Sequence, residues 1–256
     1  MKLSKTILLL LITVLVLNCK NDKSHTDIIE TKEDFNTKET VKIIPISHGT
    51  LILETEDDVI YIDPTGGKKA FDGQKRPTLV LITDIHGDHL SNETLSALNL
   101  NSVHVIVPKA VAEKIPDSTI ASPQILDNGK TITVNAVKIE AVPMYNLREE
   151  ALKYHTKGRG NGYLLTINNE RIYISGDTED IPEMRNLKNI DKAFVCMNLP
   201  YTMPVESAAS AILEFKPKQV YPYHYRGTEG LSDIAKFKQI VNDGDKTIDV
   251  QLLDWY

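Results

Sequence analysis

Two carboxylates and two imidazoles lie within six consecutive residues, directly after the apolar run 79–82 (LVLI), which predicts a buried strand. These four side chains are Asp84, His86, Asp88 and His89. Such a cluster is costly without a cation, and carboxylates and imidazoles are common ligands of divalent metals. Gly87 allows a turn that would direct the first two side chains to one cation and the last two to another. The spacing therefore predicts two adjacent metal ions, the alternative being a polar loop with a helix-capping aspartate.

Two later segments carry side chains of the same kind at the ends of predicted strands. Residues 174–178 (ISGDT) contain Asp177, and residues 221–225 (YPYHY) contain His224. Together with residues 84–89 (DIHGDH), these segments resemble, in order and separation, the motifs of the metallo-β-lactamase superfamily. In that superfamily the first position of the 84–89 motif is usually a histidine, and the aspartate of the second segment bridges two metals. The resemblance implies a metal-dependent hydrolase.

The resemblance covers residues 41–256. Residues 46–50 (ISHGT) and 61–64 (YIDP) resemble the opening strands of the branch that includes L-ascorbate-6-phosphate lactonase and the N-acyl-phosphatidylethanolamine phospholipase D. It implies an α/β (α+β) fold, a four-layer αββα sandwich of the metallo-β-lactamase type. It implies no particular substrate, because this superfamily hosts many chemistries.

The resemblance also implies two divalent metal ions, with zinc or manganese expected, and a set of ligands for them. The ligands would be Asp84 and His86 for the first ion, Asp88, His89 and His224 for the second, and Asp177 between the two. Asp84 puts a hard, negative oxygen where an imidazole is usual, which shifts the metal preference toward manganese, iron or magnesium without excluding zinc.

One ligand position stays open between two residues. His155 lies in the Gly-rich loop 153–162 (KYHTKGRGNG), which could fold back toward the cluster, and it is the ligand that we favour. Asn146 stands where relatives often carry a histidine. The alternative for His155 is a loop histidine in solvent.

Two bridged cations can lower the pKa of a shared water to about 7 and polarise the bond under attack. We therefore expect a metal-bridged hydroxide that attacks a lactone, ester or phosphoester-type bond of a small-molecule substrate. Asp88 would orient this hydroxide as well as bind metal, and His48 or Tyr225 would assist the leaving group. For His48, a purely structural role within a strand turn is an equal alternative.

Three further features leave alternatives open. Asp63 either orients a ligand histidine or starts a turn. Arg226 either binds a substrate phosphate or carboxylate or forms a surface salt bridge. The unusual residues Asp84 and Asn146 also suit a different class of protein, a non-catalytic envelope binding protein with a degraded site.

The elements that must position these residues follow from short β-branched runs and from helical periodicity. The predicted strands are 41–46, 50–54, 59–63, 79–83, 103–107, 131–142, 162–168, 171–175, 192–197, 219–223 and 247–253. The predicted helices are 91–98, 109–115, 205–215 and 232–241, with Ser91 as the N-cap of the first. This succession supports a mixed α/β class.

The composition is that of an ordinary globular protein, with 256 residues of which 41% are hydrophobic. No Pro/Gly/Ser-rich linker divides the chain after residue 40, so residues 41–256 are predicted to form one domain. The formal charge of −6, without a basic block, argues against a nucleic-acid partner. Cys196 lies in an apolar run and is expected to be a buried thiol.

The first residues of the chain are typical of an export signal. Lys2 and Lys5 precede the apolar run 7–17, which is too short to span a bilayer. Residues 15–19 (LVLNC) resemble a bacterial lipobox, which implies a signal peptide over 1–18 and a lipid anchor on Cys19 in the bacterial cell envelope, facing the periplasm or the surface. A plain secretory signal or a short anchor is the alternative. Residues 19–40 are mostly polar and predict a flexible tether.

Overall fold

The computed structural model describes residues 41–256. The predicted signal peptide, the tether and Cys19 lie outside the described residues. Within residues 41–256, no helix is both long enough and apolar enough to cross a membrane.

The first of two large sheets has six strands in the order β1-β2-β3-β4-β5-β6. Its strands are β1 (Lys42–Ser47), β2 (Thr50–Glu54), β3 (Val59–Ile62), β4 (Leu79–Leu81), β5 (His104–Val107) and β6 (Gln124–Ile125). The first three strands pair antiparallel, and β3 to β6 pair parallel. The side chains that follow β3 and β4 therefore emerge at the same edge.

The second sheet has seven strands in the order β15-β12-β11-β10-β9-β8-β7. Its strands are β7 (Thr131–Val134), β8 (Val137–Met144), β9 (Gly160–Ile167), β10 (Glu170–Ile174), β11 (Lys192–Val195), β12 (Gln219–Pro222) and β15 (Asp249–Val250). Strands β7 to β10 pair antiparallel, and β10, β11, β12 and β15 pair parallel. A separate short hairpin joins β13 (Arg226–Gly227) and β14 (Gly230–Leu231).

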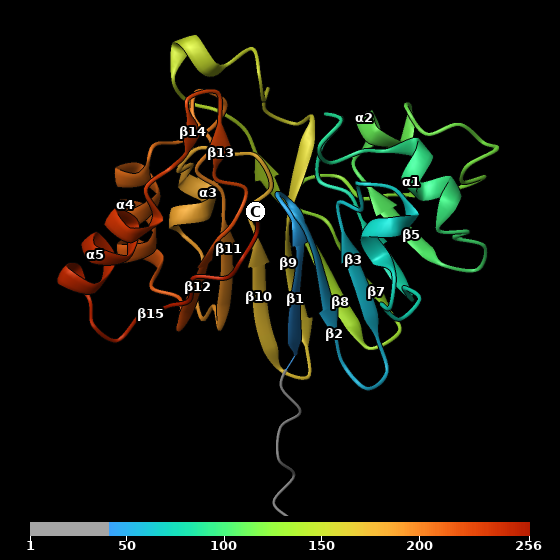
Figure 1. The fold of residues 1–256 in the computed structure, drawn as a ribbon, viewed down its shortest axis with the longest axis horizontal. Coiled ribbons are helices and arrows are strands. Elements are labelled where there is room, and N and C mark those ends of the chain that lie inside the picture. Colours follow the sequence, from blue (N-terminus) through green and yellow to red (C-terminus); the bar gives the residue numbers. More distant parts are fainter. Residues whose placement is uncertain (1–40) are drawn as a thin grey trace, which may run out of the picture. The chain divides into compact units, whose positions relative to one another are not determined.

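Helices cover the outer faces of the two sheets, as Figure 1 shows: α1 and α2 lie on one side and α3, α4 and α5 on the other. The helices are α1 (Asn92–Ala97), α2 (Lys109–Ala112), α3 (Pro182–Arg185), α4 (Val205–Phe215) and α5 (Ile234–Gly244), with 3₁₀ turns at Lys68–Phe71 and Glu149–Ala151. Ser91 caps α1 as predicted, because its side chain accepts a hydrogen bond from the Thr94 N–H. The four layers confirm the predicted αββα sandwich.

Strand β4 shows why the run before the cluster is apolar at every position. Leu79 and Leu81 belong to the core that also contains the second sheet, whereas Val80 and Ile82 pack in the core that contains residues of α1 and α2. All four are fully buried. A strand covered on both faces needs apolar side chains on both, and it holds the loop that follows it rigidly.

Two predicted strands are wrong in extent. Residues 131–142 form a hairpin of β7 and β8 rather than one strand, because Asn135 turns the chain with a φ of 52°, a conformation that asparagine tolerates. Of residues 247–253, only β15 (Asp249–Val250) pairs as a strand, beside β12. Neither correction moves a candidate site residue.

Candidate metal centre

The predicted site residues come together where strands of both sheets end. The segment 84–89 follows β4, Asp177 follows β10, and His224 follows β12. The loop between β8 and β9 supplies His155, and the turn between β1 and β2 supplies His48. Strands β10 and β12 run parallel in one sheet, so their carboxyl ends share an edge.

Three residues at this edge have a left-handed backbone. The φ angles are 54° at His48, 46° at Asp63 and 47° at His224. Such angles are uncommon outside glycine and collect at functional sites, where the surroundings impose them. Gly49 allows the close approach of the His224 ring, because a Cβ there would lie 2.7 Å from His224 Cδ2.

Three groups of side chains each place one ligand atom per residue within 4.8 Å of the others, and contacts between their members join the groups. They are Asp84, His86 and His155; His89, Asp177 and His224; and His48, Asp88 and His224. All seven predicted ligands therefore lie in one cluster. We call the first group the Asp84 group and the second the His89 group.

Asp177 belongs to the His89 group and also contacts the Asp84 group through His155. Its Oδ2 is 3.2 Å from His155 Nε2 and 3.3 Å from His89 Nε2, and its Oδ1 is 3.5 Å from His224 Nε2. Burial alone would raise the pKa of Asp177, but the neighbouring His224 and His89 outweigh it and hold the pKa well below its usual range. The carboxylate is thus ionised at the centre of the cluster.

Two of the three histidines that face Asp177, His89 and His155, are oriented by groups behind them. His89 Nδ1 donates to Asp63 Oδ2 at 2.7 Å, and Asp63 also accepts from the Thr83 hydroxyl and the Thr83 N–H. His155 Nδ1 donates to the Tyr201 carbonyl at 3.1 Å. Each ring therefore directs its other nitrogen, Nε2, into the cluster, which is how histidine ligands are normally held. Asp63 takes the orienting role.

The cluster fits a divalent cation by the atoms that it leaves unsatisfied. His155 Nε2 and Asp177 Oδ1 are buried and have no hydrogen-bond partner among the described residues. His89 Nε2 and His224 Nε2 face each other at 3.2 Å across the same space. Buried acceptors without partners are costly, and a cation bound among them would satisfy them together.

Asp84 is engaged by a residue that the sequence interpretation missed. Arg159 donates from Nε to Asp84 Oδ1 at 3.0 Å and from Nη2 to Asp84 Oδ2 at 2.7 Å, a two-pronged ion pair. His86 Nδ1 lies 2.8 Å from the same Oδ2. Burial would raise the pKa of Asp84, but these partners and His89 outweigh it and lower the pKa. The sequence carried one signal of this pair: an arginine in the same loop as His155, together with an aspartate where the superfamily usually has a histidine.

Asn146 forms hydrogen bonds with the loop that carries His155. Its Nδ2 donates to the carbonyls of Ala151 and Tyr201, and its N–H donates to the His155 carbonyl. Asn146 therefore braces the loop that carries His155, while its own Oδ1 is buried without a hydrogen-bond partner among the described residues. His155 lies with Asp84 and His86 in one group of ligand atoms.

The two proposed proton donors are placed differently. His48 Nε2 lies 3.3 Å from Asp88 Oδ2, beside the cluster. Tyr225 is buried, and its ring packs edge-on against Tyr256 at 4.9 Å between centroids. The Arg226 guanidinium lies over the Tyr256 ring, 4.1 Å from its centre.

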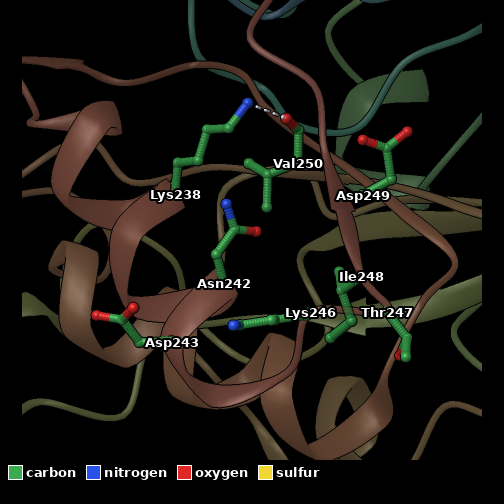
Figure 2. Close-up of a pocket in the computed structure, with 8 residues that line it drawn as sticks. All are labelled: Lys238, Asn242, Asp243, Lys246, Thr247, Ile248, Asp249 and Val250. Carbon is green, nitrogen blue, oxygen red and sulfur yellow. Dashed lines mark hydrogen bonds between the residues drawn. The ribbon is translucent and has the colours of Figure 1, made fainter.

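A cavity of about 250 Å³ opens beside the cluster. Its lining residues are His86, Asp88, Tyr154, His155, Asp177, Asn198 and Tyr201. Tyr225 is not among them. A larger hollow of about 450 Å³ lies between α5 and β15 (Figure 2), but surface lysines and aspartates line it and none of the clustered histidines does. The chemistry therefore belongs to the smaller cavity.

Comparison with known proteins agrees with this geometry. Residues 42–224 match the family model described as the Beta-lactamase superfamily domain. The chain belongs to this superfamily. A UPF0173 metal-dependent hydrolase of Pyrococcus abyssi is 27% identical over 218 residues, covering 81% of this chain and 95% of the relative. A UPF0173 metal-dependent hydrolase of Nanoarchaeum equitans is 30% identical over 192 residues, covering 72% and 84%.

Solved structures extend the likeness. A crystal structure described as a metal-dependent hydrolase from Parabacteroides distasonis aligns with a TM-score of 0.76 and 38% identity, covering 85% of this chain and 94% of that one. A metallo hydrolase from Ignicoccus hospitalis aligns with a TM-score of 0.69 and 21% identity, covering 84% and 95%, and shows the shared fold. The protein is a metal-dependent hydrolase of the β-lactamase superfamily, as its motifs predicted.

Proposed function

We propose that this enzyme hydrolyses a lactone, ester or phosphoester-type bond of a small molecule, with two divalent cations, zinc or manganese, at the cluster. The observation that carries the proposal is the pair of buried acceptors without partners, His155 Nε2 and Asp177 Oδ1, at a cavity beside two ligand groups. Bound cations of this kind supply an acidified water and polarise the carbonyl or phosphoryl oxygen under attack.

Asp88 is the residue of the cluster best placed to orient a water molecule. It lines the cavity, its side chain is 42% exposed, and its Oδ2 lies within 3.4 Å of both His48 Nε2 and His224 Nε2. Burial would raise the pKa of Asp88, but hydrogen bonds from these two histidines hold it far below its usual range. The carboxylate is therefore an ionised acceptor that can hold a proton of the attacking water.

The walls of the cavity suggest the size and character of the substrate. At about 250 Å³ the cavity is at or below the lower end of the usual range for ligand sites, which favours a small molecule or the end of a larger one. Tyr154 and Tyr201 form an edge-on aromatic pair with centroids 5.0 Å apart. Asn198 accepts a hydrogen bond from Thr202 through Oδ1, which leaves its Nδ2 to donate to a substrate oxygen.

Metal analysis of the purified full chain tests the proposal. We expect close to two ions per chain after reconstitution, and a lower content in His86→Ala and Asp177→Asn. His104→Ala is the matched control, because His104 is an exposed histidine at the start of β5. The metal-loaded chain should then hydrolyse at least one member of a panel of lactones, esters and phosphodiesters. A chain that takes up no metal would favour the non-catalytic binding protein instead.

We propose that the enzyme acts in the bacterial cell envelope, anchored by lipid on Cys19. The support is the order of charge, apolar run and cysteine in the first nineteen residues. Cys19→Ser should move the protein from the membrane fraction to the soluble fraction and remove the lipid from the mass of the N-terminal peptide. Unchanged fractionation and mass would contradict the anchor.

A further inference from the structure

Tyr256 reaches the metal centre from a distant part of the sequence. Its hydroxyl lies 2.8 Å from Nδ1 of His48, which is 208 positions away in the chain. The same oxygen lies 3.1 Å from the backbone N–H of Tyr225 and 3.1 Å from that of Arg226. The hydroxyl thus joins the β1–β2 turn to the segment that follows His224.

The position of this hydroxyl is fixed by contacts of the ring. The Arg226 guanidinium covers one face of the ring at 4.1 Å, and the Tyr225 ring packs edge-on against it. Next to Tyr256, the Trp255 carbonyl accepts the His48 N–H at 3.4 Å, and the His48 carbonyl accepts the His224 N–H at 3.2 Å. The ring contacts of Tyr256 and the backbone hydrogen bonds of His48 together hold the phenol oxygen against the imidazole.

Counting protons at the phenol oxygen determines the direction of each hydrogen bond. A tyrosine hydroxyl has one proton to donate and two lone pairs that accept. The backbone N–H groups of Tyr225 and Arg226 can only donate, so they occupy both lone pairs. The hydroxyl proton must then go to His48 Nδ1. Burial raises the pKa of Tyr256 to about 12, so this proton stays on the phenol at neutral pH.

The direction of this bond sets the tautomer of His48. An imidazole that accepts at Nδ1 carries its proton at Nε2. His48 Nε2 is the atom that lies 3.3 Å from Asp88 Oδ2, so it is a donor to that carboxylate oxygen. A cationic His48 would present a second donor hydrogen to an oxygen whose lone pairs are already occupied. The neutral ring with Nε2–H is the form that satisfies every partner.

We propose that Tyr256 is a positioning residue that holds His48 in the Nε2–H tautomer, so that His48 donates to Asp88 Oδ2 and fixes the orientation of this carboxylate. The His48 ring also packs against the His224 ring at a tilt of 42°, with centroids 3.9 Å apart, so the same contact restrains a proposed metal ligand. The inference deepens the proposed function and rests on it only for the role of Asp88 in catalysis. The tautomer itself is a property of the chain.

Nitrogen NMR of the histidine rings tests the inference directly. The full chain would be labelled with ¹⁵N-histidine and studied both without metal and loaded with zinc, with the His48 signals identified by their loss in His48→Gln. We expect the unprotonated nitrogen of His48 at Nδ1 and the protonated one at Nε2. Tyr256→Phe, which keeps the ring, should shift His48 toward a mixture of tautomers. A His48 protonated at Nδ1 in the wild-type chain, or an unchanged pattern in Tyr256→Phe, would overturn the proposal.

A kinetic measurement separates positioning from folding. For a hydrolysed substrate, Tyr256→Phe should lower kcat about 10-fold with little change in KM, within the range found for partners of metal ligands. Tyr221→Phe is the matched control, because it also removes one tyrosine hydroxyl, which there bonds Gln219 at the start of β12, and both constants should stay unchanged. If the proposed function fails, no substrate is turned over, and the tautomer spectrum still decides the role of Tyr256.

Discussion

The two ligand groups meet where His155 contacts Asp177, but they differ in how the protein supports them. In the His89 group every side chain is at most 3% exposed, and Asp63 orients the His89 ring from behind. In the Asp84 group the His86 side chain is 39% exposed, and Arg159 occupies both oxygens of Asp84. The His89 group is the buried half, and the Asp84 group is the half that is open at His86 and already paired with the Arg159 guanidinium.

This difference indicates that the two metal positions of one motif need not bind their ions with equal affinity. A guanidinium beside the Asp84 group brings a positive charge to the place where a second cation would bind. Within residues 41–256, no arginine or lysine forms an ion pair with the His89 group, whose histidines are surrounded by carboxylates. We therefore expect the His89 group to bind its ion more tightly than the Asp84 group.

The largest effect is expected from breaking the buried half. His89→Gln should lower activity about 1,000-fold, because the several kcal/mol that a catalytic cation contributes would be lost. The change also leaves Asp63 and Asp177 without a shared partner, so it should destabilise the fold by about 3–5 kcal/mol. Chelator competition and chemical unfolding measure the two effects.

The same measurements on His86→Ala sharpen the contrast. Because the His86 side chain is 39% exposed, its loss should remove one ion and leave the free energy of unfolding nearly unchanged. Equal losses of stability in His86→Ala and His89→Gln would show that the two halves are equivalent.

The next largest effect concerns the brace behind His89. Asp63→Asn keeps the size of the side chain but weakens its hold on His89 Nδ1, so metal affinity of the His89 group should fall about 10–100-fold. Asp58→Asn is the matched control, because Asp58 is also a buried aspartate that accepts from a threonine hydroxyl, outside the cluster. Similar metal affinity in both variants would show that Asp63 does not contribute to the tighter binding expected of the His89 group.

Much of the site could be predicted from sequence because its ligands follow strands that periodicity identifies. Asp177 and His224 come directly after runs whose pattern is that of buried strands, and the structure places them at one edge. Local sequence patterns do not predict the order of the strands in the two sheets. The resemblance supplied it, and the structure confirmed the four layers.

The parts that sequence did not predict depend on contacts between distant segments. Arg159 and Asp84 are 75 positions apart, and Tyr256 and His48 are 208 apart. No local spacing links such residues, because only the packed fold brings them within hydrogen-bond distance. Tyr225, expected to assist the leaving group, packs its ring edge-on against Tyr256 and is not part of the cavity lining.

A smaller effect is expected from removing the Arg159 guanidinium beside Asp84. Arg159→Ala should raise the affinity of the Asp84 group for a second ion about 10-fold, because it removes a nearby positive charge and frees both carboxylate oxygens. Arg185→Ala is the matched control, since Arg185 pairs with Asp180 and Glu214 outside the cluster. Stepwise titration with a metal-sensitive dye gives the two affinities. A weaker second site would mean that Arg159 holds Asp84 in its binding orientation instead.

The smallest effect is a pH dependence of the metal-free chain that should separate the two halves again. Burial lowers the pKa of His89, but Asp177 and Asp63 outweigh it and raise the pKa well above 6.5. Its protonation therefore contributes stability that is complete below pH 6.5 and is lost as the pH rises through the folded value. The depressed pKa of Asp177 adds stability that is complete above pH 3.8 and is lost as the pH falls below it.

The unfolding temperature of the metal-free chain should therefore be highest between about pH 4 and 6.5. It should fall by a few degrees at alkaline pH, because each kcal/mol of lost stability lowers it by about 2–4 °C. Bound metal occupies the unprotonated Nε2 of His89, so the metal-loaded chain should lose this alkaline decline. In His89→Gln the decline should also disappear, whereas in His86→Ala it should remain. A decline that persists in His89→Gln would place the titrating group outside the buried half and break the comparison.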